Sequence, residues 1–233
     1  MNKYFDHTLL KAFATQRDIE KLCNEALQMN TASVCVNPKW ISFCKEKLKT
    51  SDVKVCTVIG FPLGADGLDI KSSACKQALE NGADEIDYVI DIGAALMHDW
   101  KQIRKEMLIM TEICHNEHKC VKVIFENCYL SKSEIKELSS IARDIQPDYI
   151  KTSTGFGTGG AKLDDVLLMK KYVGDKVKIK AAGGIHTWKE CKAFIEAGAT
   201  RIGASATINI LNEYKVEEWN GNQRIRTSCE QYS

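Results

Sequence analysis

Two lysines end β-branched runs of the chain, and a glycine-rich turn follows each of them. Lys151 lies in "DYIKTSTGFGTGGAK", residues 148–162, and Lys180 lies in "VKIKAAGGIHT", residues 177–187. On adjacent strands about 4.8 Å apart, two ammonium groups would repel, and repulsion with partial burial lowers the pKa of at least one lysine. A neutral amine attacks an aldehyde or ketone to form a Schiff base. A single lysine in this position would be explained as the cap of a strand end or as the partner of a carboxylate. Two lysines in equivalent positions favour nucleophilic chemistry instead.

Charged residues alternate with apolar ones in two further runs, "DEIDYVID" and "VKVIFE". In the first run Glu85 and Asp87 share one face, and in the second Lys122 and Glu126 do so. We expect the apolar faces to pack on helices and the charged faces to point inward, joined by Asp6 from an earlier run. Glu85 and Lys122 are expected to form an ion pair that holds the interior together. Asp87 is the candidate acid or base, because it lies mid-strand within reach of a lysine adduct.

Glycines follow the last two β-branched runs, "KIKAAGGIHT" and "TRIGASAT". Backbone N–H groups in such turns commonly bind phosphate, and Gly183, Gly184, Gly203 and Ser205 could supply N–H and hydroxyl donors. Each glycine alone would be an ordinary turn residue, but two such turns on consecutive runs favour a phosphate site. The histidines and cysteines lack the spacing of a zinc site, and "GFGTGG" is neither a P-loop nor a dinucleotide fingerprint. We therefore expect no metal and no cofactor.

The runs that carry these residues alternate with segments of helical period. Eight runs predict strands: "KYFDHT", "SVCV", "VKVCTVIG", "EIDYVI", "VKVIFE", "DYIKTS", "VKIKAA" and "TRIGAS". Between the first two, residues 15–30 predict a helix, because Thr15 and Asp18 resemble a capping box. Its expected buried stripe is Ile19, Leu22, Cys23, Ala26 and Leu27. Strand–helix alternation over this length predicts an α/β fold, a closed (β/α)8 TIM barrel rather than an open sheet.

In such a barrel the active residues lie at the C-terminal ends of the strands. Lys151 is expected to end the fifth strand, and Lys180 the sixth, or the seventh if "KYFDHT" opens the barrel. The segments "ENGADEI" and "EAGATRI" each place a glycine where a helix should stop. We expect a single domain over residues 1–233, with a polar, poorly periodic tail from about residue 211.

Composition limits the classes of function. The 233 residues are 44% hydrophobic, and 32 basic residues nearly balance 31 acidic ones without a run of like charge, which argues against nucleic-acid and membrane binding. Asp6 and His7 interrupt the start where a signal peptide would be apolar. Ten cysteines occur without a C-x-x-C pair and are expected to be reduced, mostly buried thiols. These features predict a cytoplasmic protein acting on a small molecule.

The chain resembles the deoxyribose-phosphate aldolase family over roughly residues 4–210. The resemblance rests on "DHTLL", "VCVNP", "VIGFPLG", "GADEIDYVIDIGA", "VKVIFENCYL", "DYIKTSTGFGTGGA", "VKIKAAGGIHT" and "GATRIGAS", in this order. It implies a TIM barrel and a metal-independent class I aldolase that reversibly cleaves 2-deoxy-D-ribose 5-phosphate into acetaldehyde and D-glyceraldehyde 3-phosphate, in deoxynucleoside catabolism. It also implies a homo-oligomer, a dimer or tetramer.

The resemblance also implies roles for individual residues. The Schiff-base lysine of the family falls on Lys151, the second lysine, which perturbs the first, on Lys180, and the proton-relay aspartate on Asp87. These are the three residues that the chemistry of the runs selects. The expected substrate-binding set is Asp6, Cys35, Lys122, Thr154, Gly155, Gly183, Gly184, Gly203 and Ser205. Cys35 would otherwise be an ordinary buried strand cysteine.

The chain departs from the family pattern at a few positions. His186 and Ala206 stand where an arginine and a serine are common, and each change could remove one donor to a phosphate. Asp91 replaces a common asparagine and adds a charge near the site. Tyr232 could reach the site, as a terminal tyrosine does in some relatives, although a disordered tail is the simpler expectation.

Two other functions use the same residues differently. A sugar-phosphate isomerase or epimerase would need the phosphate turns and not the lysines, and would turn over substrate without an adduct that borohydride traps. A catalytically silent sugar-phosphate binding protein would be stabilised by its ligand without any turnover. The intact set of Lys151, Lys180 and Asp87 argues against the silent protein.

Overall fold

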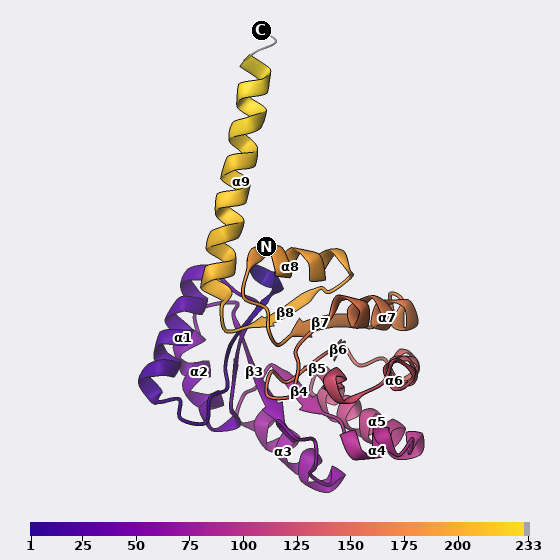
Figure 1. The fold of residues 1–233 in the computed structure, drawn as a ribbon. Coiled ribbons are helices and arrows are strands. Elements are labelled where there is room, and N and C mark those ends of the chain that lie inside the picture. The colour runs from indigo at the N-terminus through magenta and orange to yellow at the C-terminus, as the bar shows by residue number, and fades with distance from the viewer. Residues whose placement is uncertain (231–233) are drawn as a thin grey trace.

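Eight parallel strands pair in chain order and close into a barrel, with β1 beside β8 (Figure 1). The computed structural model describes residues 1–230, with side chains up to residue 219. The strands are β1 (Phe5–Leu9), β2 (Ser33–Val36), β3 (Lys54–Ile59), β4 (Glu85–Val89), β5 (Cys120–Ile124), β6 (Tyr149–Lys151), β7 (Lys178–Ala182) and β8 (Arg201–Ala204). This confirms the TIM barrel and all eight strand predictions.

Helices surround the barrel, as expected for strand–helix alternation (Figure 1). They are α1 (Gln16–Met29), α2 (Ile41–Leu48), α3 (Leu68–Glu80), α4 (Ile92–Leu96), α5 (Trp100–Asn116), α6 (Lys132–Ile145), α7 (Leu163–Val173), α8 (Trp188–Glu196) and α9 (Thr207–Glu230). Short 3-10 turns occur at η1 (Asn2–Tyr4), η2 (Pro38–Trp40) and η3 (Asn127–Tyr129). In the part of the chain that the structure describes, no helix has both the length and the apolar character needed to cross a membrane.

Helix α1 begins where the sequence predicts. The Thr15 side chain accepts a hydrogen bond from the backbone of Asp18, and the Asp18 carboxylate accepts one from the backbone N–H of Thr15, which completes the capping box. The stripe of Ile19, Leu22, Cys23 and Ala26 is buried. Leu27 is exposed, so its inclusion in the stripe was wrong. Helix α1 is followed by its C-cap Asn30, which has a left-handed φ of 51°.

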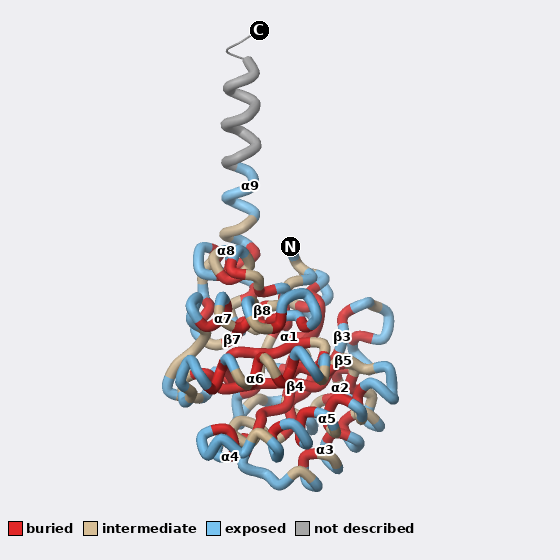
Figure 2. The backbone as a smooth tube through the Cα atoms, turned by 90° about the vertical axis from the view of Figure 1, so that its right-hand side faces the viewer, coloured by how far each residue is buried: buried red, intermediate tan, exposed pale blue. Residues whose placement is uncertain are grey.

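Each strand separates two environments, and β4 shows the division clearly. Ile86 and Tyr88 point outward into the large apolar core between barrel and helices, whereas Glu85 and Asp87 point into the barrel. The same alternation holds on β5, where Lys122 points inward. Figure 2 shows buried backbone along the strands and exposed backbone mainly on the surrounding segments. Burying the outer apolar faces against helices stabilises the fold and leaves the charged faces inside.

Three sequence-based expectations need correction. "KYFDHT" does open the barrel, so Lys151 ends the sixth strand, and Lys180 is the third of five residues of β7 rather than its last. Asp91 does not continue β4; its side chain caps α4 by accepting from the N–H of Ala94. The tail is helical, because α9 runs from Thr207 to Glu230 and projects beyond the barrel (Figure 1). Tyr232 lies outside the described residues, and the single-domain organisation stays a prediction.

Candidate active site

Asp87 lies at the centre of a group of ammonium groups inside the barrel. Its Oδ2 accepts hydrogen bonds from Lys151 Nζ at 2.8 Å and from Lys180 Nζ at 2.7 Å. Its Oδ1 accepts from Lys122 Nζ at 2.8 Å and from Cys56 Sγ at 3.1 Å. Lys151 and Lys180 are register partners on β6 and β7, which is why one carboxylate oxygen reaches both. The three residues chosen from the sequence are thus in direct contact.

Asp6 and Arg201 extend this group toward the start of the strands. Asp6 accepts hydrogen bonds from Lys180 Nζ at 2.5 Å, from Ser33 Oγ at 2.7 Å and from Arg201 Nη1 at 2.6 Å. Arg201 also contacts Glu85 Oε2 at 3.2 Å, and that carboxylate accepts from Lys122 at 2.6 Å. We call the seven residues linked in this way the ion cluster: Asp6, Glu85, Asp87, Lys122, Lys151, Lys180 and Arg201.

Opposite charges dominate the electrostatics of the ion cluster. Burial alone would raise the pKa of Asp87, but the three surrounding ammonium groups outweigh it and hold that pKa well below its usual value. Burial likewise opposes ionisation of Asp6, and Lys180 is the strongest of the cations that lower its pKa. Burial lowers the pKa of Lys180, but the carboxylates of Asp6 and Asp87 raise it overall. All three groups are therefore held in their charged forms.

This geometry adds a carboxylate to the expected contact between the two lysines. The sequence predicted repulsion between two neighbouring ammonium groups, and the structure places Asp87 between Lys151 and Lys180, where it accepts a hydrogen bond from each. The expected lowering of the pKa of at least one lysine stays a prediction. Of the two, Lys180 is the one that stays charged, because the carboxylates of Asp6 and Asp87 raise its pKa. A single sequence could not show this, because the effect depends on where three strands place one carboxylate oxygen.

A cavity of about 340 Å³ opens above the ion cluster at the C-terminal ends of β1, β6, β7 and β8. Among the residues expected to contact substrate, those that line it are Lys151, Thr154, Gly155, Gly183, Gly184, Gly203 and Ser205. Asp6, Cys35 and Lys122 lie below the cavity floor and are at most 1% exposed, so they do not line it. Lys151 alone connects the ion cluster to this space, since its side chain belongs to both.

The glycine turns leave backbone donors facing the cavity. Gly183 has φ +86°, and Gly160 packs so closely on it that a Cβ at Gly160 would meet the Gly183 carbonyl oxygen at 2.3 Å. Among the described residues, the N–H groups of Gly184 and Ser205 have no protein acceptor. Helix α9 begins two residues after Ser205. Free N–H groups beside a helix start favour an anion such as phosphate.

Comparison with known proteins agrees with this arrangement. The model of the DeoC/LacD family of aldolases matches residues 1–231. A deoxyribose-phosphate aldolase of Caldicellulosiruptor saccharolyticus is 50% identical over 212 residues, which cover 91% of this chain and 96% of the relative. A deoxyribose-phosphate aldolase of Lactococcus lactis subsp. lactis is 47% identical over 211 residues, which cover 91% of this chain and 95% of the relative. The chain belongs to the DeoC/LacD aldolase family.

Solved structures of similar chains support the assignment to the DeoC/LacD family. A putative deoxyribose-phosphate aldolase from Coccidioides immitis superposes with a TM-score of 0.88 at 34% identity, over 92% of this chain and 85% of that one. The deoxyribose phosphate aldolase from Aeropyrum pernix, described as a unique tetrameric structure, gives a TM-score of 0.85 at 28% identity, over 92% and 90% of the two chains.

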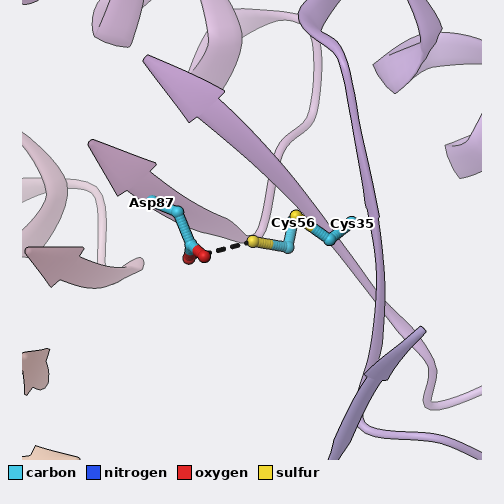
Figure 3. Close-up of side chains that lie close together, drawn as sticks. All are labelled: Cys35, Cys56 and Asp87. Carbon is cyan, nitrogen blue, oxygen red and sulfur yellow. Dashed lines mark hydrogen bonds between the residues drawn. The ribbon is translucent and has the colours of Figure 1, made fainter. Parts of the chain in front are cut away.

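Two thiols lie against the central carboxylate of this DeoC/LacD aldolase (Figure 3). Cys35 Sγ, Cys56 Sγ and a carboxylate oxygen of Asp87 lie within 4.8 Å of one another, a spacing that could hold a metal ion. However, Asp87 already accepts from three ammonium groups, and burial raises the pKa of Cys56 so that its thiol keeps its proton. A cation would meet the positive charges of Lys122 and Lys180 there, so these donors do not fit a metal. The expectation of a metal-free site stays a prediction.

The sequence analysis missed several residues of the site. Arg201 was part of a predicted strand but received no role, although the period of two in "TRIGAS" places it on the same face as Gly203. Thr8, Lys11 and Phe156 line the cavity from loops and strand ends. Thr8 could have been found, because the period of two in β1 places it on the same face as Asp6. No sequence pattern identifies Lys11 and Phe156, because loop positions have no period that fixes their direction.

Proposed function

We propose that this chain is a class I aldolase that reversibly cleaves 2-deoxy-D-ribose 5-phosphate into acetaldehyde and D-glyceraldehyde 3-phosphate, with Lys151 as the Schiff-base lysine. The two relatives from Caldicellulosiruptor saccharolyticus and Lactococcus lactis described above bear the name of this activity. The observation that carries the proposal is the position of Lys151, which lines the cavity and whose Nζ also contacts Asp87 in the ion cluster. A carbonyl carbon bound in the cavity would meet this amine first.

Charge balance in the ion cluster supports a neutral Lys151. The cluster holds three carboxylates against three lysines and one arginine, so it carries one excess positive charge when every group is ionised. Burial disfavours an uncompensated charge. Lys122 and Lys180 each contact two carboxylates at 2.8 Å or less, whereas Lys151 contacts one. Loss of the Lys151 proton therefore removes the excess charge at the smallest loss of ion pairing.

The neutral amine attacks C1 of the open-chain sugar phosphate, and loss of water gives an iminium ion. Asp87 accepts the proton of the C3 hydroxyl, directly or through a water, as the C2–C3 bond breaks. The electron pair of that bond forms a C1=C2 double bond, and the π electrons of the C1=N bond become the nitrogen lone pair, which gives an enamine. C3 becomes the aldehyde carbon of glyceraldehyde 3-phosphate. Because the pKa of Asp87 is held low, the proton is passed on to C2. Hydrolysis of the resulting iminium releases acetaldehyde and restores Lys151.

We place the phosphate at the glycine turns. The free N–H groups of Gly184 and Ser205 and the start of α9 provide donors, and the Lys11 side chain lines the same cavity. His186 also lines the cavity, and its backbone N–H donates to Glu190 rather than toward the ligand. Anchoring the phosphate there orients C1 toward Lys151, so that binding energy far from the reacting carbons aids the reaction.

Trapping the adduct tests this proposal. The protein is incubated with acetaldehyde and borohydride and digested, and any ethylated lysine is located by mass spectrometry. We expect the label on Lys151, its loss in Lys151→Ala, and no turnover of 2-deoxyribose 5-phosphate by that variant. Turnover should persist with a chelator present. Turnover that survives Lys151→Ala, with no trapped adduct in the wild type, would refute the Schiff base and favour an isomerase-like use of the barrel.

We also propose that the chain is a cytoplasmic homo-oligomer. The Aeropyrum pernix relative is described as tetrameric, and the described helices include none able to cross a membrane. Light scattering coupled to gel filtration measures the mass of the particle directly. A mass of a single chain at micromolar concentration would contradict the oligomer.

A further inference from the structure

Arg201 lies beneath the reacting lysine and outside the cavity. It is the first residue of β8, and its Nη1 bonds to Asp6 Oδ1 at 2.6 Å and to Glu85 Oε2 at 3.2 Å. Its Nη2 contacts the hydroxyl of Tyr149 at 3.4 Å. The guanidinium does not line the cavity, so it has no contact with substrate. Any effect on the reaction must act through its neighbours.

Charge count shows what Arg201 contributes. A guanidinium stays protonated in proteins, whereas a lysine can lose its proton. With Arg201 present, three protonated lysines leave the ion cluster with one excess positive charge; without it, three lysines balance three carboxylates. Loss of the lysine proton is favoured only in the first case. The positive charge of Arg201 is therefore the excess charge, and the ion cluster becomes neutral when one lysine loses its proton.

The charge count of the ion cluster leaves out the other titratable groups that face this interior. β2, β3 and β5 each contribute a thiol, β6 contributes a phenol, and β7 contributes an ammonium group that is exposed to solvent. These groups are Cys35, Cys56, Cys120, Tyr149 and Lys178. Burial raises the pKa of Cys56 and, to about 12, that of Cys120, so these two thiols stay neutral. The contact with the Cys56 thiol outweighs burial and lowers the pKa of Cys35.

We propose that Arg201 is a positioning residue for catalysis: its fixed charge, transmitted through Asp6, Lys180 and Asp87, leaves Lys151 unprotonated and nucleophilic near neutral pH. This inference rests on the Schiff-base function proposed above. It goes beyond the pair of lysines, because it assigns the proton loss to the charge of the whole cluster. The two lysines by themselves do not explain the proton loss, because the negative charge of Asp87 lies between them and offsets their repulsion.

The direction and size of the effect follow from the charges. Arg201 and Lys151 are each the register partner of Lys180, so they lie two strands apart, or about 10 Å. One unit charge at that distance, at an effective dielectric constant of about 20, shifts a protonation equilibrium by roughly one pH unit. The rate of adduct formation falls at acid pH as Lys151 becomes protonated, and we call this part of the pH profile the acid limb. Removing the arginine charge should move the acid limb to higher pH by this amount, which lowers the rate at a given pH on the limb about tenfold. Removing the Glu85 charge should move the limb to lower pH.

The experiment measures the rate of borohydride-trapped acetaldehyde adduct on Lys151 from pH 5 to pH 9. The variants are Arg201→Gln, Arg201→Lys, Glu85→Gln and the double variant Arg201→Gln/Glu85→Gln. Arg104→Gln is the matched control, because Arg104 forms a half-exposed surface pair with Asp144. We expect the limb to move up in Arg201→Gln, to move down in Glu85→Gln, and to stay near the wild-type position in Arg201→Lys, the double variant and the control.

Each result has a defined meaning. Thermal melting identifies any variant that fails to fold, and if Arg201→Gln does not fold, the downward shift in Glu85→Gln carries the test. Limbs that coincide in all folded variants would overturn the role of Arg201 while leaving the Schiff base intact. The absence of any adduct in the wild type would instead refute the proposed function. Equal upward shifts in Arg201→Gln and Arg201→Lys would show that contacts rather than charge matter, and would also overturn the proposal.

Discussion

Replacement of Asp87 by asparagine removes the one carboxylate that three buried lysines share. The carboxylate is fully buried and accepts from Lys122, Lys151 and Lys180 at 2.7–2.8 Å. An amide nitrogen in place of one oxygen would present hydrogens to an ammonium donor. Lys122 and Lys180 would keep Glu85 and Asp6 as acceptors, whereas Lys151 would keep no carboxylate. Breaking a buried ion pair from one side costs about 3–5 kcal/mol. For a chain of this size each kcal/mol lowers Tm by about 2–4 °C, so we expect Tm to fall by roughly 6–20 °C.

The pH dependence of this loss identifies its cause. In the wild type the pKa of Lys180 is raised on folding, so its stabilisation is present below the unfolded pKa of about 10.4 and is lost as pH rises through the folded value. In Asp87→Asn, buried lysines that lose their carboxylate have a folded pKa below the unfolded one. The unfolded state then binds more protons, and stability rises with pH. The Tm difference from wild type should therefore shrink between pH 7 and pH 9.

Calorimetry or circular dichroism at both pH values measures this difference. Asp144→Asn is the control, because Asp144 pairs with arginines on the surface and such pairs contribute about 0–1 kcal/mol. Turnover of Asp87→Asn should also fall, by about 10²–10⁴-fold, since the proton acceptor is gone. A Tm drop as small as that of the control, or one that grows toward pH 9, would refute the view that Asp87 neutralises the buried lysines.

Two further predictions concern Gly203 and Asp6. A Cβ on Gly203 would lie 3.0 Å from Lys180 Cε and 3.0 Å from Ala182 Cβ, so Gly203→Ala should cost about 1–3 kcal/mol and reduce kcat/KM, whereas Gly67→Ala, where nothing lies within 4 Å, should not. Unchanged kcat/KM and Tm in Gly203→Ala would contradict this packing. The pKa of Asp6 is depressed on folding, so its stabilisation is present above the unfolded pKa of about 3.9 and is lost below it. Asp6→Asn should therefore lose less stability on acidification than the wild type does. Circular dichroism from pH 6 to pH 2 measures this loss, and an equal loss in both proteins would count against this ion pairing.

Much of the site could be predicted because strand alternation is strict. The period of two placed Glu85, Asp87 and Lys122 on the inner face, and the structure confirms all three. The glycine turns were located in the same way, since Gly183 and Gly184 directly follow a strand end. Lys11 was not found, because it lies beyond the end of β1 in a segment without periodic constraint.

Helix signals were reliable where they were local. The capping box at Thr15 depends on four consecutive residues and formed as expected. The prediction for the tail was wrong because no such local signal is present: α9 lacks a periodic apolar stripe, so its sequence resembles a loop. The structure nevertheless forms a helix from Thr207 to Glu230. Leu27 shows that a helical stripe can run past the edge of the core that buries it.

The sequence by itself determined the barrel, the inward face of each charged strand and the identity of the lysine pair with its aspartate. These follow from period, order and residue type, which a linear chain contains. The tertiary structure alone decided that Asp87 lies between Lys151 and Lys180, that Lys180 is held charged, and that Arg201 belongs to the same cluster. Electrostatic effects depend on distances of a few ångströms between strands far apart in sequence, such as β1 and β8, and only closure of the barrel sets those distances.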